Sequence, residues 1–282
     1  MEKLFSQLSR NLYIIPGGYF VSKFLRGLFS KDSQSSNWKE FSFRGISMKV
    51  DLSKHMGKAI YWRGAHDWSP IFTLESQLKK GDTFIDVGAN QGEYTLWAAR
   101  KVGTTGKVYS FEPMAGLFAQ LKENIQLNPK YNSVFHPIQL GLSNEPGELE
   151  LFTQPGENEG TNTIFSSDQF NISLGKIQLD TLDNQVEKLG ITRIDVMKVD
   201  VEGAELQVLQ GGEKSIEKFR PKLLLEINRE ACKSGGYEAE DILELLQKYD
   251  YKFFQLGLRG KLTPIKTLPE FCNILALPRQ NP

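Results

Sequence analysis

The distribution of apolar residues changes near residue 80. From there onward, short runs of apolar and β-branched residues alternate with segments in which apolar residues recur every three or four positions. The first pattern predicts buried strands and the second predicts amphipathic helices. The predicted strands cover residues 83–88, 107–113, 133–142, 194–200, 222–228, 251–256 and 273–278. The predicted helices cover residues 92–102, 116–128, 203–210 and 238–249.

This alternation of strands and helices indicates how the sheet is built. Continuous apolar strands that are separated by helices are typical of a mainly parallel sheet with helices on both faces. The expected fold class is therefore α/β, with a doubly wound sheet of seven strands. The segment 143–182 is polar and rich in turn residues, so we expect it to be an insertion near the active-site face.

Residues 1–70 follow a different pattern and are predicted to form an extension that precedes a domain of residues 71–282. In this extension Phe20, Phe24 and Leu28 recur at a spacing of four, which predicts a short amphipathic helix. We expect this helix to pack on the domain as a cap, or on a second subunit in a homo-oligomer. A role at a membrane surface is the less favoured alternative.

The extension also contains a linker and predicted strands. Residues 31–37 are polar and linker-like, and the alternation in residues 41–53 and 59–64 indicates a hairpin or edge strands. The apolar run over residues 12–29 is interrupted by Pro-Gly-Gly and by basic residues. It therefore falls short of the roughly 20 apolar residues of a spanning helix. No small-residue cleavage site follows it, so neither a transmembrane segment nor a signal peptide is expected.

The composition is that of an ordinary globular protein. The chain has 282 residues, of which 40% are apolar and 24% charged, and its 34 basic residues balance 34 acidic ones. Without a net positive charge, an extended contact with nucleic acid is not expected. Cys232 and Cys272 fit no metal-binding spacing and no disulfide framework. We therefore expect reduced thiols and a cytoplasmic location.

Polar residues follow the predicted parallel strands at their carboxyl ends, where an open α/β sheet binds its ligands. Asp86 lies in the first strand and the sequence Gly-Ala-Asn-Gln-Gly of residues 88–92 follows it. Glu112 follows the second strand, 20 residues after the last of these glycines. Two later strands end in residues 198–203 and 226–228. An acidic residue at the position of Glu112 suits the two hydroxyls of a ribose.

The glycine-rich loop distinguishes between classes of cofactor. A dinucleotide site needs Gly-x-Gly-x-x-Gly, because a pyrophosphate lies against the helix N-terminus. Here the loop contains Gly88, Asn90 and Gly92, and Asp86 precedes it. A carboxylate repels a pyrophosphate but attracts the sulfonium and ammonium groups of S-adenosylmethionine. The loop therefore favours S-adenosylmethionine, and an NAD-dependent oxidoreductase is the disfavoured alternative.

Several segments together resemble a known family. In chain order they are FIDVGANQGEYTLWAA, FEP, GLSN, MKVDVEGAE and PKLLLEIN. They resemble the FkbM family of S-adenosylmethionine-dependent methyltransferases over residues 60–277. The resemblance implies a class I, Rossmann-like methyltransferase fold. It also implies O-methylation of a hydroxyl group on a sugar, a glycan or a natural product.

The resemblance implies roles for individual residues as well. One set would surround the cofactor: Asp86, Gly88, Asn90 and Gly92 at its methionine part, Glu112 at the ribose, and Leu142 and Ser143 at the adenine. A second set matches the other signature block, at the floor of the active site: Lys198, Asp200 and Glu202. Family members commonly carry a histidine shortly after the glutamate of the fifth strand, whereas Asn228 stands there in this chain, after Glu226.

Three residues are candidates to receive the proton of the acceptor hydroxyl: Asp200, Glu226 and His66. We expect Asp200 to orient the acceptor and the cofactor, and Glu226 or His66 to take the proton. Asp200 and Glu202 are also of the type that binds Mg²⁺. Because the sequence shows no third carboxylate beside them, no metal is expected.

Two other functions are alternatives to this hypothesis. A nucleic-acid methyltransferase that modifies amino groups would carry an Asn/Asp-Pro-Pro-aromatic tetrapeptide, which this chain lacks. A non-catalytic cofactor-binding protein is disfavoured by the intact loop, Glu112 and the block 198–203. The favoured partner is therefore a hydroxyl-bearing small molecule or glycan. We expect residues 1–70 and 143–182 to form its pocket.

Overall fold

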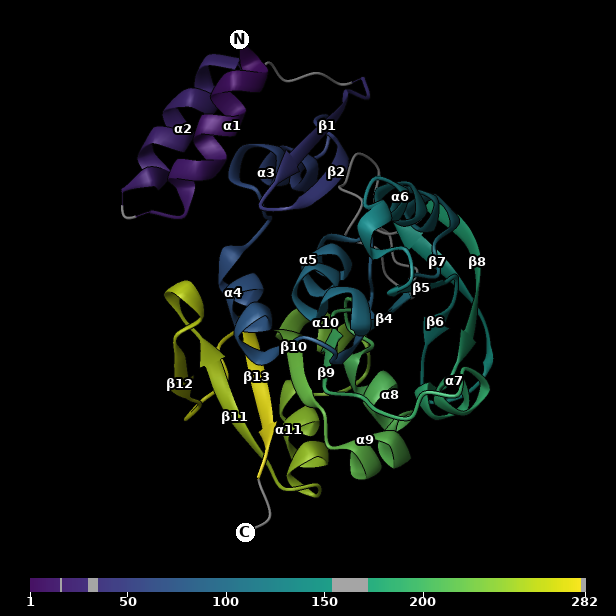
Figure 1. The fold of residues 1–282 in the computed structure, drawn as a ribbon. Helices are drawn as coiled ribbons and strands as arrows, with labels where there is room; N and C mark the ends of the chain where they lie inside the picture. Colours follow the sequence, from purple (N-terminus) through teal and green to yellow (C-terminus); the bar gives the residue numbers. More distant parts are fainter. Residues whose placement is uncertain (16, 30–34, 154–171, 280–282) are drawn as a thin grey trace.

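A large sheet runs through the computed structural model, which describes residues 1–15, 17–29, 35–153 and 172–279 (Figure 1). Its strands are β3 (Thr83–Val87), β4 (Lys107–Phe111), β5 (Phe135–Ile138), β9 (Val196–Val199), β10 (Lys222–Asn228), β11 (Tyr251–Leu256), β12 (Leu262–Pro264) and β13 (Phe271–Pro278). They lie in the order β12-β11-β13-β10-β9-β3-β4-β5. From β5 to β10 neighbouring strands are parallel, whereas β13, β11 and β12 pair antiparallel.

This sheet confirms the predicted α/β class, with one correction to the strand count. The sequence pattern predicted seven strands, but the sheet has eight. The additional strand, β12, has three residues and pairs with β11 at the edge of the sheet. Such a short strand carries no readable alternation of apolar and polar residues, so the pattern did not reveal it.

Helices cover both faces of the large sheet. After β3 they are α5 (Glu93–Val102), α6 (Ala115–Gln126), α7 (Leu182–Lys188), α8 (Glu205–Gln210), α9 (Glu213–Phe219), α10 (Arg229–Ser234) and α11 (Ala239–Gln247), with short 3-10 turns η1 (Gly103–Thr105), η2 (Pro129–Tyr131) and η3 (Leu258–Gly260). Phe84 and Ile85, neighbours in β3, belong to different apolar clusters. Because side chains alternate along a strand, these clusters lie on opposite faces, and the sheet is buried on both.

A second, smaller sheet stands beside the first and is formed by β6 (Gly141–Leu142), β8 (Ile172–Asp180) and β7 (Gly147–Thr153), in that order. The prediction of one strand over residues 133–142 was wrong. The strand ends at Ile138, where a turn closes with a hydrogen bond from the Leu140 N–H to the Ile138 carbonyl, and β6 then joins the second sheet. The part of the predicted insertion that covers residues 154–171 lies outside the described residues.

The chain begins with a pair of helices that stands apart from the large sheet (Figure 1). The elements before β3 are α1 (Glu2–Tyr13), α2 (Gly18–Phe29), β1 (Trp38–Phe43), β2 (Ile46–Asp51), α3 (His55–Arg63) and α4 (Trp68–Gln77). The predicted helix is confirmed as α2, and the predicted hairpin as the antiparallel pair β1 and β2. The strand expected over residues 59–64 is instead the end of α3. Gly64 adopts the left-handed conformation there and closes the helix with an N–H bond to the Ile60 carbonyl.

Polar contacts attach α1 to α3. The Ser9 hydroxyl donates to the Trp62 carbonyl at 2.6 Å, and the Arg10 guanidinium donates to the Tyr61 carbonyl at 2.5 Å. Arg10 also lies over the Phe41 ring, 4.4 Å from its centroid. Burial lowers the pKa of Arg10 to about 10. No helix in the described ranges combines the length and the apolar character that crossing a membrane requires.

Candidate active site

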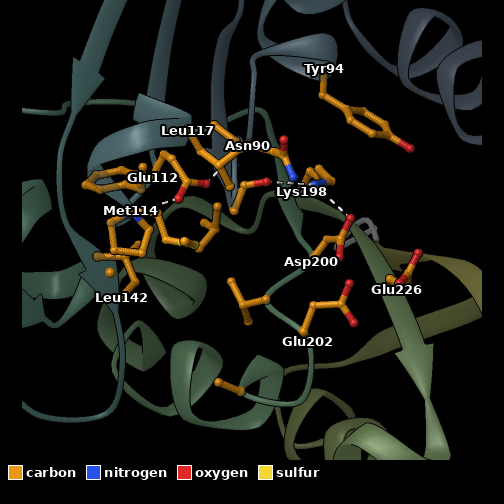
Figure 2. A pocket seen from close by; sticks show the side chains of 18 of the residues that line it. Asn90, Tyr94, Glu112, Met114, Leu117, Leu142, Lys198, Asp200, Glu202 and Glu226 are labelled. Atoms are coloured by element: carbon orange, nitrogen blue, oxygen red, sulfur yellow. Dashed lines mark hydrogen bonds and ion pairs between the residues drawn. The ribbon is translucent and has the colours of Figure 1, made fainter. Parts of the chain in front are cut away.

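A cavity of about 280 Å³ opens at the carboxyl ends of β3, β4, β9 and β10 (Figure 2). The small sheet contributes Leu149, Ile177 and Leu179 to its lining. The loop between α3 and α4 contributes His66 and Asp67. The cavity therefore lies where an open α/β sheet binds its ligands, and both the predicted insertion and the extension help to enclose it.

Glu112 lies at the apolar end of this cavity, with Met114, Leu117 and Leu142 around it (Figure 2). Its side chain is buried and accepts two backbone hydrogen bonds, from the Asn90 N–H at 2.8 Å and from the Met114 N–H at 2.9 Å. Burial raises the pKa of Glu112 to about 7, although both N–H bonds oppose this shift. Glu112 therefore also holds the glycine-rich loop in place, a role that the sequence did not reveal.

We expect the change Glu112→Ala to weaken cofactor binding at least tenfold, because a lost buried bond to a charged group costs about 1.5–3 kcal/mol. Isothermal titration calorimetry with S-adenosylhomocysteine measures this, with Glu145→Ala, an exposed carboxylate between β6 and β7, as the control. The melting temperature of the ligand-free protein separates the two roles of Glu112. A lower melting temperature indicates lost support of the loop. Unchanged affinity would remove Glu112 from the site.

The glycine-rich loop passes close to the next strand end. Gly88 has a φ of +76°, and a Cβ at this position would lie 1.9 Å from the Asp200 carbonyl oxygen. Gly92 has a φ of +96°, and its Cβ would lie 2.6 Å from a methyl carbon of Leu121. Gly88 and Asn90 line the cavity, whereas Gly92 is buried behind it. The requirement for glycine at position 92 is therefore one of packing.

Lys198 connects the loop to the opposite side of the cavity. Its ammonium lies 3.0 Å from Asp200 Oδ2 and 3.9 Å from Asp86 Oδ1, and it donates to the Gly88 carbonyl at 3.2 Å. Burial opposes the charge of this ammonium, but the carboxylates of Asp200 and Asp86 raise the pKa of Lys198 overall. Lys198 is therefore a permanent cation that neutralises and orients Asp200.

Asp86, which the sequence placed at the methionine part of a cofactor, lies behind the cavity wall. It is fully buried, is not among the lining residues, and its Oδ2 accepts a hydrogen bond from the Thr95 hydroxyl at 2.7 Å. Burial raises the pKa of Asp86, against the effects of Lys198 and Thr95. The sequence predicted that Asp86 lies near the end of a strand. Asp86 acts on the cavity indirectly, through its ion pair with Lys198.

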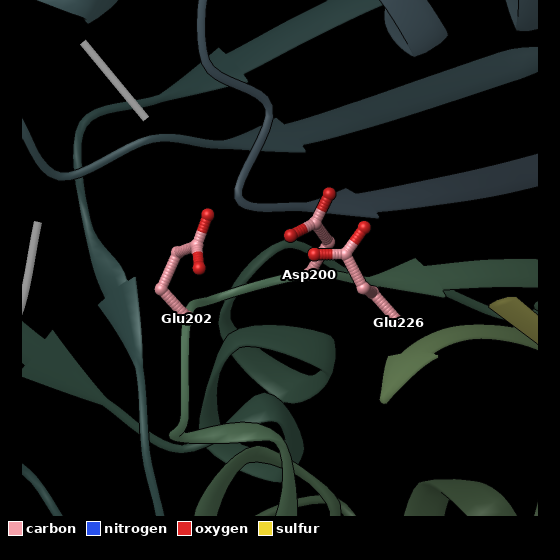
Figure 3. A group of neighbouring side chains, drawn as sticks. All are labelled: Asp200, Glu202 and Glu226. Atoms are coloured by element: carbon pink, nitrogen blue, oxygen red, sulfur yellow. The ribbon is translucent and has the colours of Figure 1, made fainter. Parts of the chain in front are cut away.

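Three carboxylates meet at the other end of the cavity: Asp200, Glu202 and Glu226 (Figure 3). One oxygen of each lies within 4.8 Å of the others. Burial, and then the charge of Asp200, raises the pKa of Glu202 to about 8 and that of Glu226 to about 9. The sequence-based argument that Asp200 and Glu202 lack a third carboxylate was therefore wrong. Glu226 comes from β10, which follows both of them in the chain.

His66 lies at the rim of the cavity and its side chain reaches solvent. Partial burial, and then the neighbouring His55, lowers the pKa of His66, so its imidazole is neutral at neutral pH. Leu142 and Ser143 line the apolar end of the cavity. Asn228 caps α10 by accepting the N–H groups of Glu230 and Ala231 and is not a lining residue.

Residues that the sequence analysis did not single out also shape the cavity. Glu93 is buried and accepts the backbone N–H of His66 at 2.7 Å, which fixes the rim. The ring centroid of Tyr94 lies 4.6 Å from the Lys198 ammonium. Glu205 accepts the N–H groups of Val201 and Gly203 and the Tyr237 hydroxyl. Both glutamates lie within the quoted segments, at Gly-Glu in FIDVGANQGEYTLWAA and at Ala-Glu in MKVDVEGAE, and this position was an available signal.

Several known proteins resemble this chain in sequence. A model of the methyltransferase FkbM domain matches residues 86–253. The hexuronic acid methyltransferase AglP of Haloferax volcanii is 28% identical over 188 residues, which are 66% of this chain and 69% of that protein. The 2-O-methyltransferase NoeI of Sinorhizobium fredii is 26% identical over 206 residues, which are 66% of this chain and 81% of that protein.

A solved structure shares the fold. The crystal structure of a methyltransferase FkbM from Methylobacillus flagellatus matches with a TM-score of 0.50 and 15% identity. The match covers 74% of this chain and 47% of that one, so this chain spans about half the length of that relative. The fold in common is the class I methyltransferase fold that the sequence predicted.

Proposed function

Because the chain belongs to the FkbM methyltransferase family, we propose that it transfers a methyl group from S-adenosylmethionine to a hydroxyl group of a sugar, a glycan or a natural product. The observation that carries this proposal is one cavity that joins an apolar end at Glu112 to a carboxylate cluster at Asp200, Glu202 and Glu226. The names of AglP and NoeI, a hexuronic acid methyltransferase and a 2-O-methyltransferase, support a sugar hydroxyl as the acceptor.

The side chains around the cavity fit the parts of this cofactor. Leu117 and Leu142 offer apolar surface for an adenine, and the Glu112 carboxylate beside them can accept from ribose hydroxyls. A sulfonium and an ammonium are stabilised by a nearby carboxylate, which Asp200 supplies. When bound, S-adenosylmethionine supplies a methyl group to the acceptor oxygen, while its sulfur keeps the bonding electron pair.

The residues of the chain then have separate tasks. Lys198 holds Asp200 in one orientation, which suits Asp200 for positioning the acceptor hydroxyl and the cationic part of the cofactor. Glu226 stands in the same cluster, and its raised pKa suits it to accept the hydroxyl proton once a cation is bound nearby. His66, neutral at the rim, is the second candidate for this proton.

Two measurements test the proposed function. Calorimetry is expected to show binding of S-adenosylhomocysteine and no binding of NADH. Transfer of a labelled methyl group is then screened over uronic acids, neutral sugars, polyketide alcohols and a nucleic-acid control. Label on a hydroxyl oxygen of a sugar or polyketide supports the proposal. Binding of NADH, or label on nucleic acid alone, contradicts it.

We expect methyl transfer to proceed without a divalent metal ion, despite the third carboxylate. The Lys198 ammonium lies 3.0 Å from Asp200 and already supplies positive charge to the cluster, so a dication would be placed next to a buried cation. Turnover measured in EDTA is therefore expected to equal turnover in Mg²⁺. Loss of turnover in EDTA with recovery in Mg²⁺ would instead make Asp200, Glu202 and Glu226 the metal ligands.

The cytoplasm is the compartment we propose. Cys232 and Cys272 are both free and buried, which is typical of proteins in reducing compartments. The acceptor would then be a cytoplasmic metabolite or a glycan under assembly.

A further inference from the structure

The helices α1 and α2 each present a row of exposed apolar side chains. On α2, Phe20, Phe24 and Leu28 are 73%, 66% and 60% exposed. On α1, Leu4 and Leu8 are exposed in the same way. A spacing of four places each row on one stripe of its helix. We call these residues the outer apolar face. Exposed apolar side chains grouped in this way indicate a surface that meets another molecule.

The opposite faces of these helices hold the pair against the rest of the chain. The Ser9 and Ser22 hydroxyls are 2.6 Å apart between α1 and α2, and Leu25 of α2 belongs to the large apolar cluster. Ser9 and Arg10 bond to carbonyl groups of α3. The helix pair is therefore held beside α3, apart from the large sheet (Figure 1).

The charge of this region differs from that of the chain as a whole. Residues 1–29 contain four basic residues and one acidic residue, whereas the complete chain is balanced. The α2 sequence has no acidic residue. Lys3 of α1 and Lys23 of α2 are both exposed. Exposed ammonium groups are suited to phosphate groups.

We propose that α1 and α2 dock on the surface of a membrane that contains anionic lipids. The outer apolar face enters the boundary between headgroups and acyl chains, and the exposed Lys3 of α1 and Lys23 of α2 contact lipid phosphates. Amphipathic helices with aromatic and aliphatic residues on one face and basic residues beside it bind membranes in this way. Each helix has 12 residues, so it lies on the bilayer and does not cross it.

A second copy of the chain is the competing occupant, and charge argues against it. A twofold axis through the outer apolar face would bring the same basic residues of both copies near each other. No acidic residue of α2 is available to offset that repulsion. An anionic lipid surface instead provides the complementary charge. The docking proposal is independent of the proposed function, since none of these residues lines the large cavity.

Vesicle sedimentation of the full chain tests the proposal. We expect binding to phosphatidylcholine vesicles that contain phosphatidylglycerol to be at least about tenfold tighter than to phosphatidylcholine alone, and to weaken with added salt. The double variants Phe20→Ser/Phe24→Ser and Lys3→Glu/Lys23→Glu should each weaken it about tenfold or more. Matched controls are Leu189→Ser, and Lys214→Glu/Lys218→Glu on α9, which should bind like the unchanged protein.

The outcomes separate the alternatives. Equal affinity for both vesicle types, or no binding to either, would overturn the proposal. Analytical ultracentrifugation provides the other comparison: a dimer that Phe20→Ser/Phe24→Ser dissociates would assign the outer apolar face to a second copy. Binding of S-adenosylhomocysteine should be unchanged in all these variants, which distinguishes failure of docking from failure of the proposed function.

Discussion

Replacing Glu226 by glutamine is expected to lower turnover by about 10²–10⁴-fold, the usual contribution of a general base. Glutamine has nearly the same volume and keeps a carbonyl oxygen, but it cannot take a proton. Since Glu226 stands at the end of the cavity opposite Glu112, affinity for S-adenosylhomocysteine should change little. Turnover under saturating substrate and calorimetry measure the two quantities separately.

The pH dependence gives this prediction a second readout. A base works only when deprotonated, so the rate of the unchanged enzyme should rise with pH through the pKa of Glu226. Burial and Asp200 raise that pKa to about 9 in the free protein, and the bound cofactor cation should lower it. The rising limb should disappear in Glu226→Gln.

Variants of Asp200 and His66 test whether a residue other than Glu226 is the general base. Asp200→Asn should weaken cofactor binding as well as turnover, because Asp200 is the partner of Lys198. If His66→Ala removes the rising limb and Glu226→Gln keeps it, the base is His66. Glu217→Gln, an exposed change on α9, should behave as the unchanged protein. Full turnover in both Glu226→Gln and His66→Ala would show that positioning alone carries the catalysis.

Replacing Gly88 by alanine should abolish measurable cofactor binding and destabilise the fold. A Cβ at this position would lie 1.9 Å from the Asp200 carbonyl oxygen, and the backbone φ of +76° is unfavourable for alanine. The left-handed conformation alone costs about 1–2 kcal/mol. Relief of the contact would move the loop away from the end of β9. We therefore expect a melting temperature lower by at least roughly 4 °C, on a scale of about 2–4 °C per kcal/mol.

Gly116→Ala provides the matched control for this change. Gly116 lies in the first turn of α6, and a Cβ there has no neighbouring atom within 4 Å. The free energy of unfolding of Gly116→Ala should stay the same or rise by up to about 1 kcal/mol, because alanine favours a helix more than glycine does. Calorimetry and thermal unfolding of both variants make the comparison. Unchanged affinity for S-adenosylhomocysteine in Gly88→Ala would contradict the close approach of Gly88 to the Asp200 carbonyl group.

The large sheet was predictable because its determinants are local. Ile85 and Val87 lie in a short, buried strand. The glycine-rich loop follows at once, so both the strand and the ligand edge could be read from a few adjacent residues. The strand prediction for residues 59–64 was wrong because it also used only local information. Five or six residues of mixed polarity fit a strand as well as the last turns of a helix. Only the capping geometry at Gly64 distinguishes them.

The carboxylate cluster was not predictable in this way. Glu226 meets Asp200 because β10 pairs with β9, and that pairing brings together residues that are far apart in the sequence. The burial of Asp86 behind the cavity wall is likewise a property of packing, since a strand-end aspartate has the same sequence signature whether it faces ligand or lysine. Sequence spacing placed these residues at the correct edge, and tertiary structure decided their contacts.

The apolar cluster on one face of the sheet has a consequence for how the protein unfolds. Phe43 of β1 and Trp62 of α3 belong to the same cluster as Trp97 of α5, and the rings of Phe43 and Trp97 are 6.5 Å apart. Elements with a common core open together in native-state hydrogen exchange, as one cooperative unit. The first hairpin and the sheet should thus share a single exchange free energy, so that loosening the extension also loosens the wall behind the cavity.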